Sequence, residues 1–307
     1  MRTLHSRFTA ALVVAALALT PFVRGQDTKP AAPSAPAAPT VASSAIATPP
    51  DGEKATKALV DSPRHGEWVD IALPAGADGK AATLKTWVSY PERKDNAPVV
   101  LVVHEIFGMT DWIRAVADQL AAEGFIAVAP DLLSGKGPNG GATDSFAGDA
   151  VRDAIRKLDP NEVVARLDAA RAYAIALPAA TKKTACIGFC WGGTTTWTYA
   201  TKQPALDAAI VYYGTAPDSK DALATITCPV LGLYGADDQR VTSTVEKTKT
   251  LAAEAGKTFT PKIYDGAGHG FLRQQTGRDG KNEAAAKAAW AETVALLKAT
   301  LEAKAVK

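Results

Sequence analysis

The sequence is poor in cysteine and histidine, the residues that most often build metal sites and disulfide frameworks. Of its 307 residues, three are cysteine and four are histidine. Neither C-x-x-C nor H-E-x-x-H occurs, and the His-Glu pair at His104 has Gly108 where a zinc-binding helix needs its second histidine. We therefore expect no metal and no other cofactor.

Blocks of like charge are also missing, and the formal net charge is only +2. Three of the positive charges, Arg2, Arg7 and Arg24, lie in the first 25 residues, which contain no acid, so the chain without them carries −1. Nucleic acid and anionic membrane surfaces need a basic patch or stripe. We expect neither as a partner.

The sequence lacks an apolar run long enough to span a membrane comfortably. Its longest run, from Phe8 to Val23, falls short of about 20 residues and follows two arginines. This pattern predicts a signal peptide over residues 1–25, with a retained anchor as the alternative. The chain is then exported, to the periplasm or out of the cell, with no stable membrane insertion after cleavage.

Prolines and small residues dominate the following segment, residues 26–60. Six prolines stand between Asp27 and Pro50 among alanine, serine and threonine. Such a segment cannot bury a core and favours extended, solvated backbone. We interpret it as a disordered spacer, and residues 61–307 as one domain of a size common among α/β folds.

Within this domain, buried apolar strands alternate with helical patterns. Trp68–Leu73 and Leu84–Tyr90 instead alternate apolar with polar residues, as antiparallel strands with one solvated face do. Further strands are expected at 97–108, 126–132, 183–190, 206–214, 229–235 and 260–266, and helices at 111–123, 160–177, from 191, at 242–255 and at 283–303. The order predicts an α/β fold with a mostly parallel, doubly wound sheet and antiparallel N-terminal strands. Ser134–Gly148, rich in glycine and polar residues, is either a lid over a site or a surface insertion.

One cysteine stands in a motif typical of nucleophiles. Gly188-Phe189-Cys190-Trp191-Gly192 has the G-x-nucleophile-x-G spacing, and it lies between a predicted strand and a predicted helix. A strand that turns at once into a helix leaves no room for side chains two residues on either side of the turn, so glycine is required there. The helix N-terminus then stabilises a thiolate and an oxyanion. We predict that Cys190 is a nucleophile.

A thiol nucleophile needs a base and a group that orients the base. His269 is the only histidine after Cys190, and it lies in the glycine-rich loop "DGAGHGF" behind the last predicted strand. Between them, "YGADDQRV" ends another strand, and the G-x-x-D-x-x-V spacing selects Asp238 over Asp237. All three residues follow strand C-termini, which converge where open α/β sheets bind ligands. We predict a Cys190–His269–Asp238 triad, with the N–H groups of Ile106 and Trp191 as its oxyanion hole.

The other two cysteines offer little for a disulfide. Cys186 and Cys190 are four residues apart in one predicted strand, which puts them about 13 Å from each other, beyond the reach of a disulfide. A disulfide between Cys186 and Cys228 is geometrically possible but would link neighbouring buried strands. At least one thiol stays free in either case.

The segments "HEIFG", "GFCWGG", "VYYG", "GADD" and "GHGF" together resemble the dienelactone hydrolases, which are cysteine enzymes of the α/β-hydrolase fold with carboxymethylenebutenolidase activity. The resemblance implies that Glu105 contacts the nucleophile and holds it in a resting state. It also implies that Arg273, four residues after His269, binds a substrate carboxylate. A second arginine of the family lies before the elbow, where Arg152 and Arg156 are candidates.

These features predict a hydrolase that cleaves a small-molecule lactone or ester, carboxylate-bearing substrates among them, through an acyl-cysteine intermediate. A general carboxylesterase or thioesterase is the alternative within this class. An exported binding protein without turnover is the alternative from another class, but binding alone needs no base aimed at a thiol.

Overall fold

A computed structural model describes residues 46–74 and 82–302. The predicted signal peptide and the first part of the predicted spacer lie outside the described residues. Among the helices of the described part, none is both long and apolar enough to cross a membrane.

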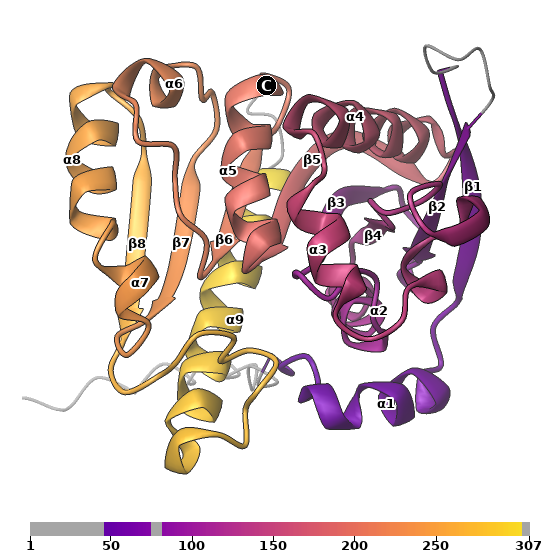
Figure 1. Cartoon of the computed structure of the whole chain (residues 1–307), viewed down its shortest axis with the longest axis horizontal. Helices are drawn as coiled ribbons and strands as arrows, with labels where there is room; N and C mark the ends of the chain where they lie inside the picture. Colours follow the sequence, from indigo (N-terminus) through magenta and orange to yellow (C-terminus); the bar gives the residue numbers. More distant parts are fainter. Residues whose placement is uncertain (1–45, 75–81, 303–307) are drawn as a thin grey trace, which may run out of the picture. The chain divides into compact units, whose positions relative to one another are not determined.

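The described strands form one sheet in the order β1-β2-β4-β3-β5-β6-β7-β8 (Figure 1). Their bounds are β1 Gly66–Leu73, β2 Ala82–Ser89, β3 Ala97–Val103, β4 Ile126–Pro130, β5 Ala180–Phe189, β6 Ala208–Tyr212, β7 Val230–Gly235 and β8 Phe259–Tyr264. The pairings β1–β2 and β2–β4 are antiparallel, and all the others are parallel. The predicted α/β sheet with antiparallel N-terminal strands is confirmed.

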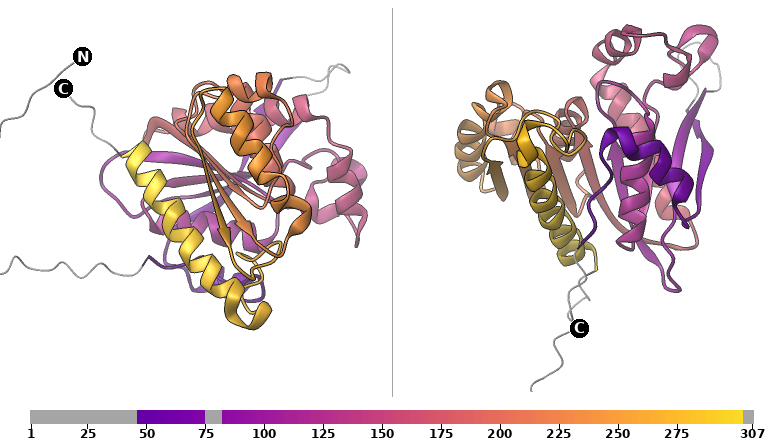
Figure 2. Two further views of the ribbon diagram at one scale, coloured as in Figure 1. Left: turned by 90° about the vertical axis from the view of Figure 1, so that its left-hand side faces the viewer. Right: turned by 90° about the horizontal axis from the view of Figure 1, so that it is seen from below.

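The sheet is buried on both faces, which is why its central strands are continuously apolar. Along β3, Val100 and Val102 belong to one core, while Val99 and Leu101 belong to the other. The first core is covered by α2 (Asp111–Ala122) and α9 (Lys281–Leu301), and the second by α4 (Pro160–Ala176), α5 (Trp191–Lys202) and α8 (Val245–Glu254). Figure 2 (left view) shows α9 and α8 on opposite sides of the strands.

Three short helices differ from the prediction. Helices α3 (Ala150–Arg156) and α6 (Lys220–Ala224) were not expected. The helix expected at 242–255 is instead α8, preceded by a separate turn, α7 (Gln239–Thr242). Thr242 Oγ1 donates to the carbonyl of Gly235 (2.7 Å), and this bond fastens the turn to the end of β7.

The expected disordered spacer at 26–60 is wrong over its last part. Residues Gly52–Lys54 form the 3-10 helix η1, and α1 extends over Ala55–Asp61. Ala55 is buried in the first core, and the Asp51 carboxylate accepts the backbone N–H of Gln275 (2.7 Å). Composition predicted a solvated chain, but tertiary partners order this segment, which lies along α2 and the loop after His269.

Candidate active site

The elbow at Cys190 has the predicted geometry. Cys190 lies between β5 and α5 with φ 57° and ψ −116°, a strained conformation for a residue with a side chain. A Cβ on Gly188 would overlap the carbonyl oxygen of Gly192, and one on Gly192 would overlap the backbone of Val103 and His104. Both glycines are therefore required by the close approach of backbones, as the spacing predicted.

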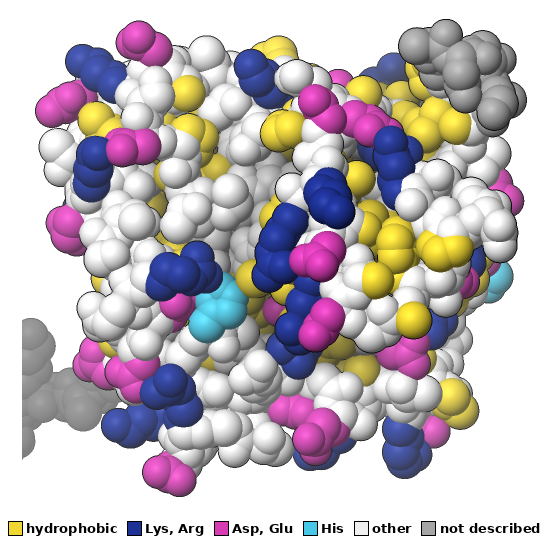
Figure 3. All heavy atoms as spheres, in the orientation of Figure 1, with side chains coloured by type: hydrophobic (Ala, Val, Ile, Leu, Met, Phe, Trp, Pro, Cys, Tyr) yellow, Lys and Arg dark blue, Asp and Glu magenta, His cyan; other side chains and the backbone are white. Residues whose placement is uncertain are grey.

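A cavity of about 370 Å³ opens beside the thiol, which is partly buried. On the face shown in Figure 3, basic side chains gather on both sides of a hollow next to a histidine. Ile106 and Trp191, the predicted oxyanion-hole residues, line the same cavity as Cys190. The remaining lining residues are Arg156, Thr194, Tyr213, Thr215 and Arg240.

His269 and Asp238 come together as predicted, although 31 residues separate them. His269 Nδ1 lies 2.5 Å from Asp238 Oδ2, and the Asp238 side chain is nearly inaccessible. Burial lowers the pKa of His269, but the hydrogen bond to Asp238 and the neighbouring Cys190 outweigh it and raise the pKa to about 9. The imidazole is thus placed between a carboxylate and the thiol.

The neighbouring acid, Asp237, is turned away from this pair. It forms an ion pair with Arg278, and both side chains are about half exposed. Its own N–H donates to the carbonyl of Ala267 (3.0 Å). The choice of Asp238 over Asp237, made from spacing, agrees with the positions of the two carboxylates.

Glu105 and Arg273 lie against each other. Arg273 Nε is 2.7 Å from Glu105 Oε2, an ion pair in which the N–H is not aligned on the oxygen. Burial raises the pKa of Glu105, while Arg273 and His269 act in the opposite direction. The Arg273 guanidinium also stacks over Phe107, 4.9 Å from the ring centroid. Glu105 is thus engaged by an arginine, and we find no hydrogen bond from it to Cys190 among the described residues.

Arg273 lines a different cavity from Cys190. That cavity, of about 420 Å³, has walls from the N-terminal segment and α2, with Asp51, Phe107 and Trp112 among them. Of the two other predicted candidates, Arg156 lines the Cys190 cavity. Arg152 stacks over Phe107 from α3, 5.0 Å from the ring centroid. The structure therefore brings Arg156, rather than Arg273 or Arg152, to the thiol's cavity.

Tyr213 is a site residue that sequence reasoning missed, although it stands in the quoted "VYYG" segment. Its φ is 41°, and its ring lies 5.0 Å from that of His269. Its buried hydroxyl has no hydrogen-bond partner among the described residues. Burial, together with Glu105 and Cys190, raises the pKa of Tyr213 well above its usual range. The tyrosine is neutral and presents an uncommitted O–H near the thiol.

His104 has a structural role at the strand end that carries Glu105 and Ile106. Its Nδ1–H donates to the carbonyl of Glu105 (2.8 Å), and its Nε2 accepts the N–H of Leu132 (3.3 Å). Burial lowers the pKa of His104, so the ring stays neutral in this one tautomer. No cluster of three or more potential metal ligands occurs among the described residues.

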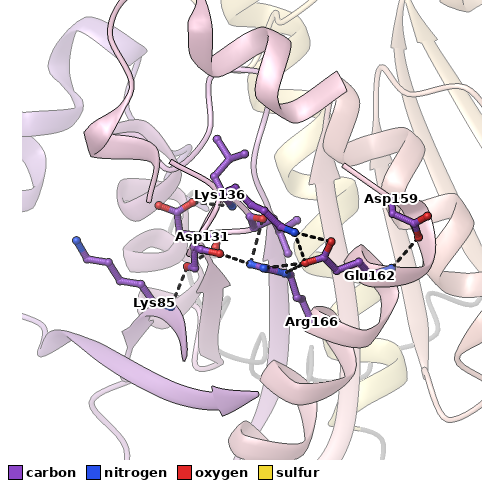
Figure 4. Close-up of polar contacts among 9 residues, drawn as sticks. Lys85, Asp131, Lys136, Asp159, Glu162 and Arg166 are labelled. Carbon is purple, nitrogen blue, oxygen red and sulfur yellow. Dashed lines mark hydrogen bonds and ion pairs between the residues drawn. The ribbon is translucent and has the colours of Figure 1, made fainter. Parts of the chain in front are cut away.

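The sequence left two alternatives for the segment Ser134–Gly148, a lid over a site or a surface insertion. In the structure this segment is hydrogen-bonded to the body of the domain. Thr143 donates its N–H and its hydroxyl to Asp131 (2.9 and 2.7 Å), and its hydroxyl accepts the N–H of Met109 (3.1 Å). Beneath it, the buried Arg166 donates to the carbonyl of Ser134 (2.8 Å) and pairs with Glu162 (Figure 4). The segment braces the loop after Glu105, and none of its residues lines the Cys190 cavity.

The two remaining cysteines are free and buried. Burial raises the pKa of Cys186 to about 12 and that of Cys228 to about 11. The structure has no disulfide between Cys186 and Cys228, a pairing that the sequence had left possible. Cys190 is therefore the one thiol among the described residues that combines exposure with a base.

Comparison with known proteins agrees with this geometry. The model of the dienelactone hydrolase family matches residues 84–301. A Salmonella typhimurium protein named as a candidate carboxymethylenebutenolidase is 33% identical over 230 residues, which is 71% of this chain and 82% of that protein. One from Methylorubrum extorquens with the same name is 37% identical over 185 residues, 57% of this chain and 63% of that one.

Among solved structures, a candidate dienelactone hydrolase from Klebsiella pneumoniae superposes with a TM-score of 0.64 at 29% identity. The match covers 76% of this chain and 98% of that one. The family match and the shared α/β-hydrolase architecture agree with the elbow and with the order of strands. The chain therefore belongs to the dienelactone hydrolase family.

Proposed function

We propose that this protein hydrolyses a small lactone or carboxylic ester through an acyl-cysteine intermediate at Cys190. The observation that carries the proposal is the hydrogen bond between His269 and Asp238 (2.5 Å) near Cys190, whose thiol lies at the strained elbow before α5. A base oriented by a carboxylate and aimed at a thiol has no use in binding alone. It is what nucleophilic catalysis requires.

In the first half-reaction, the proton of Cys190 passes to His269, and the thiolate forms a bond to the carbonyl carbon of the ester. The carbonyl electron pair moves onto oxygen, where the N–H groups of Ile106 and Trp191 stabilise the charge. Collapse of this intermediate breaks the bond to the alkoxy group. That group leaves with the proton from His269.

In the second half-reaction, His269 removes a proton from water, and the hydroxide adds to the thioester carbonyl. Collapse breaks the bond between the acyl carbon and Cys190 Sγ and releases the acid. The thiolate then takes back the proton from His269. Asp238 keeps the imidazole in one orientation throughout and stabilises its charged form. The helix N-terminus at Trp191 stabilises the thiolate when it forms.

Within this proposal, the Glu105–Arg273 ion pair belongs to the resting enzyme. Glu105 is almost fully buried, so its charge depends on Arg273 for compensation. A substrate carboxylate that draws Arg273 away would leave the buried Glu105 carboxylate without its counter-charge. Export of the mature protein through the predicted signal peptide is a separate part of the proposal.

The experiment is rapid-mixing kinetics with 4-nitrophenyl butyrate on the wild type and on Cys190→Ala and Cys190→Ser. We expect a burst of nitrophenol in the wild type, together with a butyryl mass adduct on the peptide that contains Cys190. Cys190→Ala should show neither. Turnover that persists in Cys190→Ala, or an adduct on another residue, contradicts the acyl-cysteine mechanism.

A general thioesterase is the second candidate. A cysteine nucleophile exchanges readily with thioesters, because thiolate attack and thiolate departure are then nearly balanced. The same assay with butyryl-coenzyme A separates the two, since an ester hydrolase prefers the oxygen ester by kcat/KM.

A further inference from the structure

A second cavity, of about 130 Å³, adjoins the Cys190 cavity and lies between the neighbouring helices α4 and α5 (Figure 1). Trp191 and Thr194 line both cavities. Both residues belong to the first turn of α5, directly after the proposed nucleophile. The smaller cavity, which we call the α4–α5 slot, therefore continues the Cys190 cavity along α5.

The α4–α5 slot is apolar, whereas two arginines line the Cys190 cavity. Its wall on the α4 side is aliphatic and consists of Leu158, Pro160, Val163 and Val164. None of the described residues that line the slot is charged, so a carboxylate or an ammonium group would have no counter-charge there.

Threonines form much of the wall on the α5 side, but the hydroxyls of two of them are engaged elsewhere. Thr194 Oγ1 accepts the N–H of Thr215 (3.0 Å), and Thr198 Oγ1 donates to the carbonyl of Thr194 (3.2 Å). These bonds leave the methyl groups of Thr194 and Thr198 to line the slot. The slot therefore suits a hydrocarbon group.

The proposed reaction decides which part of an ester the slot can hold. His269 protonates the leaving oxygen, so the leaving group must lie on the side of the imidazole. The His269 ring lies 5.0 Å from that of Tyr213, and neither residue lines the slot. The slot begins instead at Trp191, whose N–H is the proposed donor to the carbonyl oxygen. The acyl group is thus the part of the substrate that can enter the slot.

We propose that the α4–α5 slot binds the hydrocarbon chain of the acyl group, so that the preferred substrates are esters of uncharged, medium-chain fatty acids. An apolar cavity of about 150 Å³ holds a benzene molecule, so a slot of about 130 Å³ takes about four to six carbon atoms. The carbons nearest the thiol lie in the Cys190 cavity, and an acyl chain of about six to eight carbons should therefore fill the slot. The proposal rests on hydrolysis at Cys190.

The test measures kcat/KM for the 4-nitrophenyl esters of acetate, butyrate, hexanoate, octanoate and decanoate, each below the concentration at which it forms micelles. These esters share one leaving group, so only the acyl chain changes. The variants are Thr198→Leu, which fills the slot from α5, and Val164→Ala, which enlarges it from α4.

Thr201→Leu is the matched control. Thr201 is also a partly buried threonine of α5, and its hydroxyl donates to the carbonyl of Thr198 (2.7 Å), but it does not line the slot. Any effect of replacing a threonine on this helix by leucine should therefore appear in both variants, whereas an effect on the slot should appear only in Thr198→Leu.

In the wild type, we expect kcat/KM to rise at least about tenfold from butyrate to octanoate, because each buried methylene contributes about threefold to fourfold. Decanoate should gain nothing further. Thr198→Leu should lower the ratio of kcat/KM for octanoate to that for acetate at least about tenfold. Val164→Ala should raise the ratio of decanoate to octanoate at least about twofold, and Thr201→Leu should reproduce the wild-type series.

Equal losses on acetate and octanoate in Thr198→Leu overturn the proposal, because the nitrophenyl group that all the esters share would then occupy the slot. A chain-length series that neither Thr198→Leu nor Val164→Ala alters overturns it as well. If Thr198→Leu does not fold, Val164→Ala decides alone, since it removes atoms from the slot and adds none. Failure of the proposed function looks different, because the wild type would then cleave no ester of the series in a manner that depends on Cys190.

Discussion

Replacing Asp51 by alanine should destabilise the protein and slow catalysis, although Asp51 lies outside the segment that the family model matches. Its buried carboxylate accepts three backbone N–H groups, from Glu53 (3.0 Å), Gln275 (2.7 Å) and Thr276 (3.3 Å). Nearby, the carbonyl of Arg273 accepts the N–H of Gly52 (2.8 Å). The N-terminal segment therefore holds the loop that continues from His269.

The expected size follows from these bonds. A hydrogen bond to a charged group contributes about 1.5–3 kcal/mol, and a buried donor left without a partner costs about 1–3 kcal/mol. The Gln275 bond is short and partly buried, whereas water can replace the bond to the exposed Glu53. Asp51→Ala should then lower the free energy of unfolding by about 2–4 kcal/mol.

Activity should fall with stability, because the same loop positions the imidazole. The carbonyl of Gly270 accepts the N–H groups of Arg273 (3.0 Å) and Gln274 (2.9 Å), so a shift at Gln275 reaches His269 through one tight turn. Misplacement of a catalytic group by about 1 Å costs on the order of 100-fold, so we expect kcat/KM to fall about 10- to 100-fold.

The assay is equilibrium unfolding in urea, with kcat/KM for a neutral aryl ester measured under conditions where each variant is folded. Asp61→Ala is the control, since this exposed residue on α1 pairs only with Lys57 and should cost less than about 1 kcal/mol. If Asp51→Ala unfolds at the same urea concentration as Asp61→Ala, the N-terminal segment does not support the loop as argued.

Three other predictions concern the site and the core. Asp238→Asn should lower turnover on the order of 10⁴-fold and Asp237→Asn far less, and the reverse ranking in steady-state kinetics would contradict the assigned acid. Asp238 and Cys190 outweigh burial and raise the pKa of His269 to about 9. Above about pH 9 the Cys190–His269 pair has lost the proton that the leaving group needs, so kcat/KM should decline. In Asp238→Asn this decline should begin at lower pH. The raised pKa of His269 stabilises the folded state, fully so below its ordinary pKa of about 6.5, and this stabilisation is lost as pH rises through about 9. Urea unfolding measured across that pH range checks the prediction. Cys186→Ala should lower the free energy of unfolding by about 1–2 kcal/mol through lost packing and its contact with Thr196 (3.5 Å) while activity remains, and an inactive but folded variant would assign this thiol a chemical role.

Local patterns in the sequence determined most of the sheet and selected Cys190, His269 and Asp238 as candidate triad residues. Strands buried on both faces are continuously apolar, and the glycine spacing around Cys190 indicates an elbow, although the backbone that excludes a Cβ at Gly192 belongs to Val103 and His104. Asp238 and His269 were selected because each lies in the loop that follows a strand, and parallel strands bring their C-terminal ends to one edge of the sheet. The patterns themselves occupy short stretches of the sequence, so they can be recognised before any tertiary contact is known.

Tertiary structure alone decided which arginine lines the cavity of the thiol. The family resemblance favoured Arg273, but its side chain lies against Glu105 and Phe107, while α3 and α7 place Arg156 and Arg240 at the Cys190 cavity. A surface arginine carries no local signal of its direction, because that direction depends on how distant helices settle on the sheet. The N-terminal segment was misjudged for the same reason: its composition predicts disorder, and partners distant in the sequence, such as Trp112 on α2 and Gln275, order it.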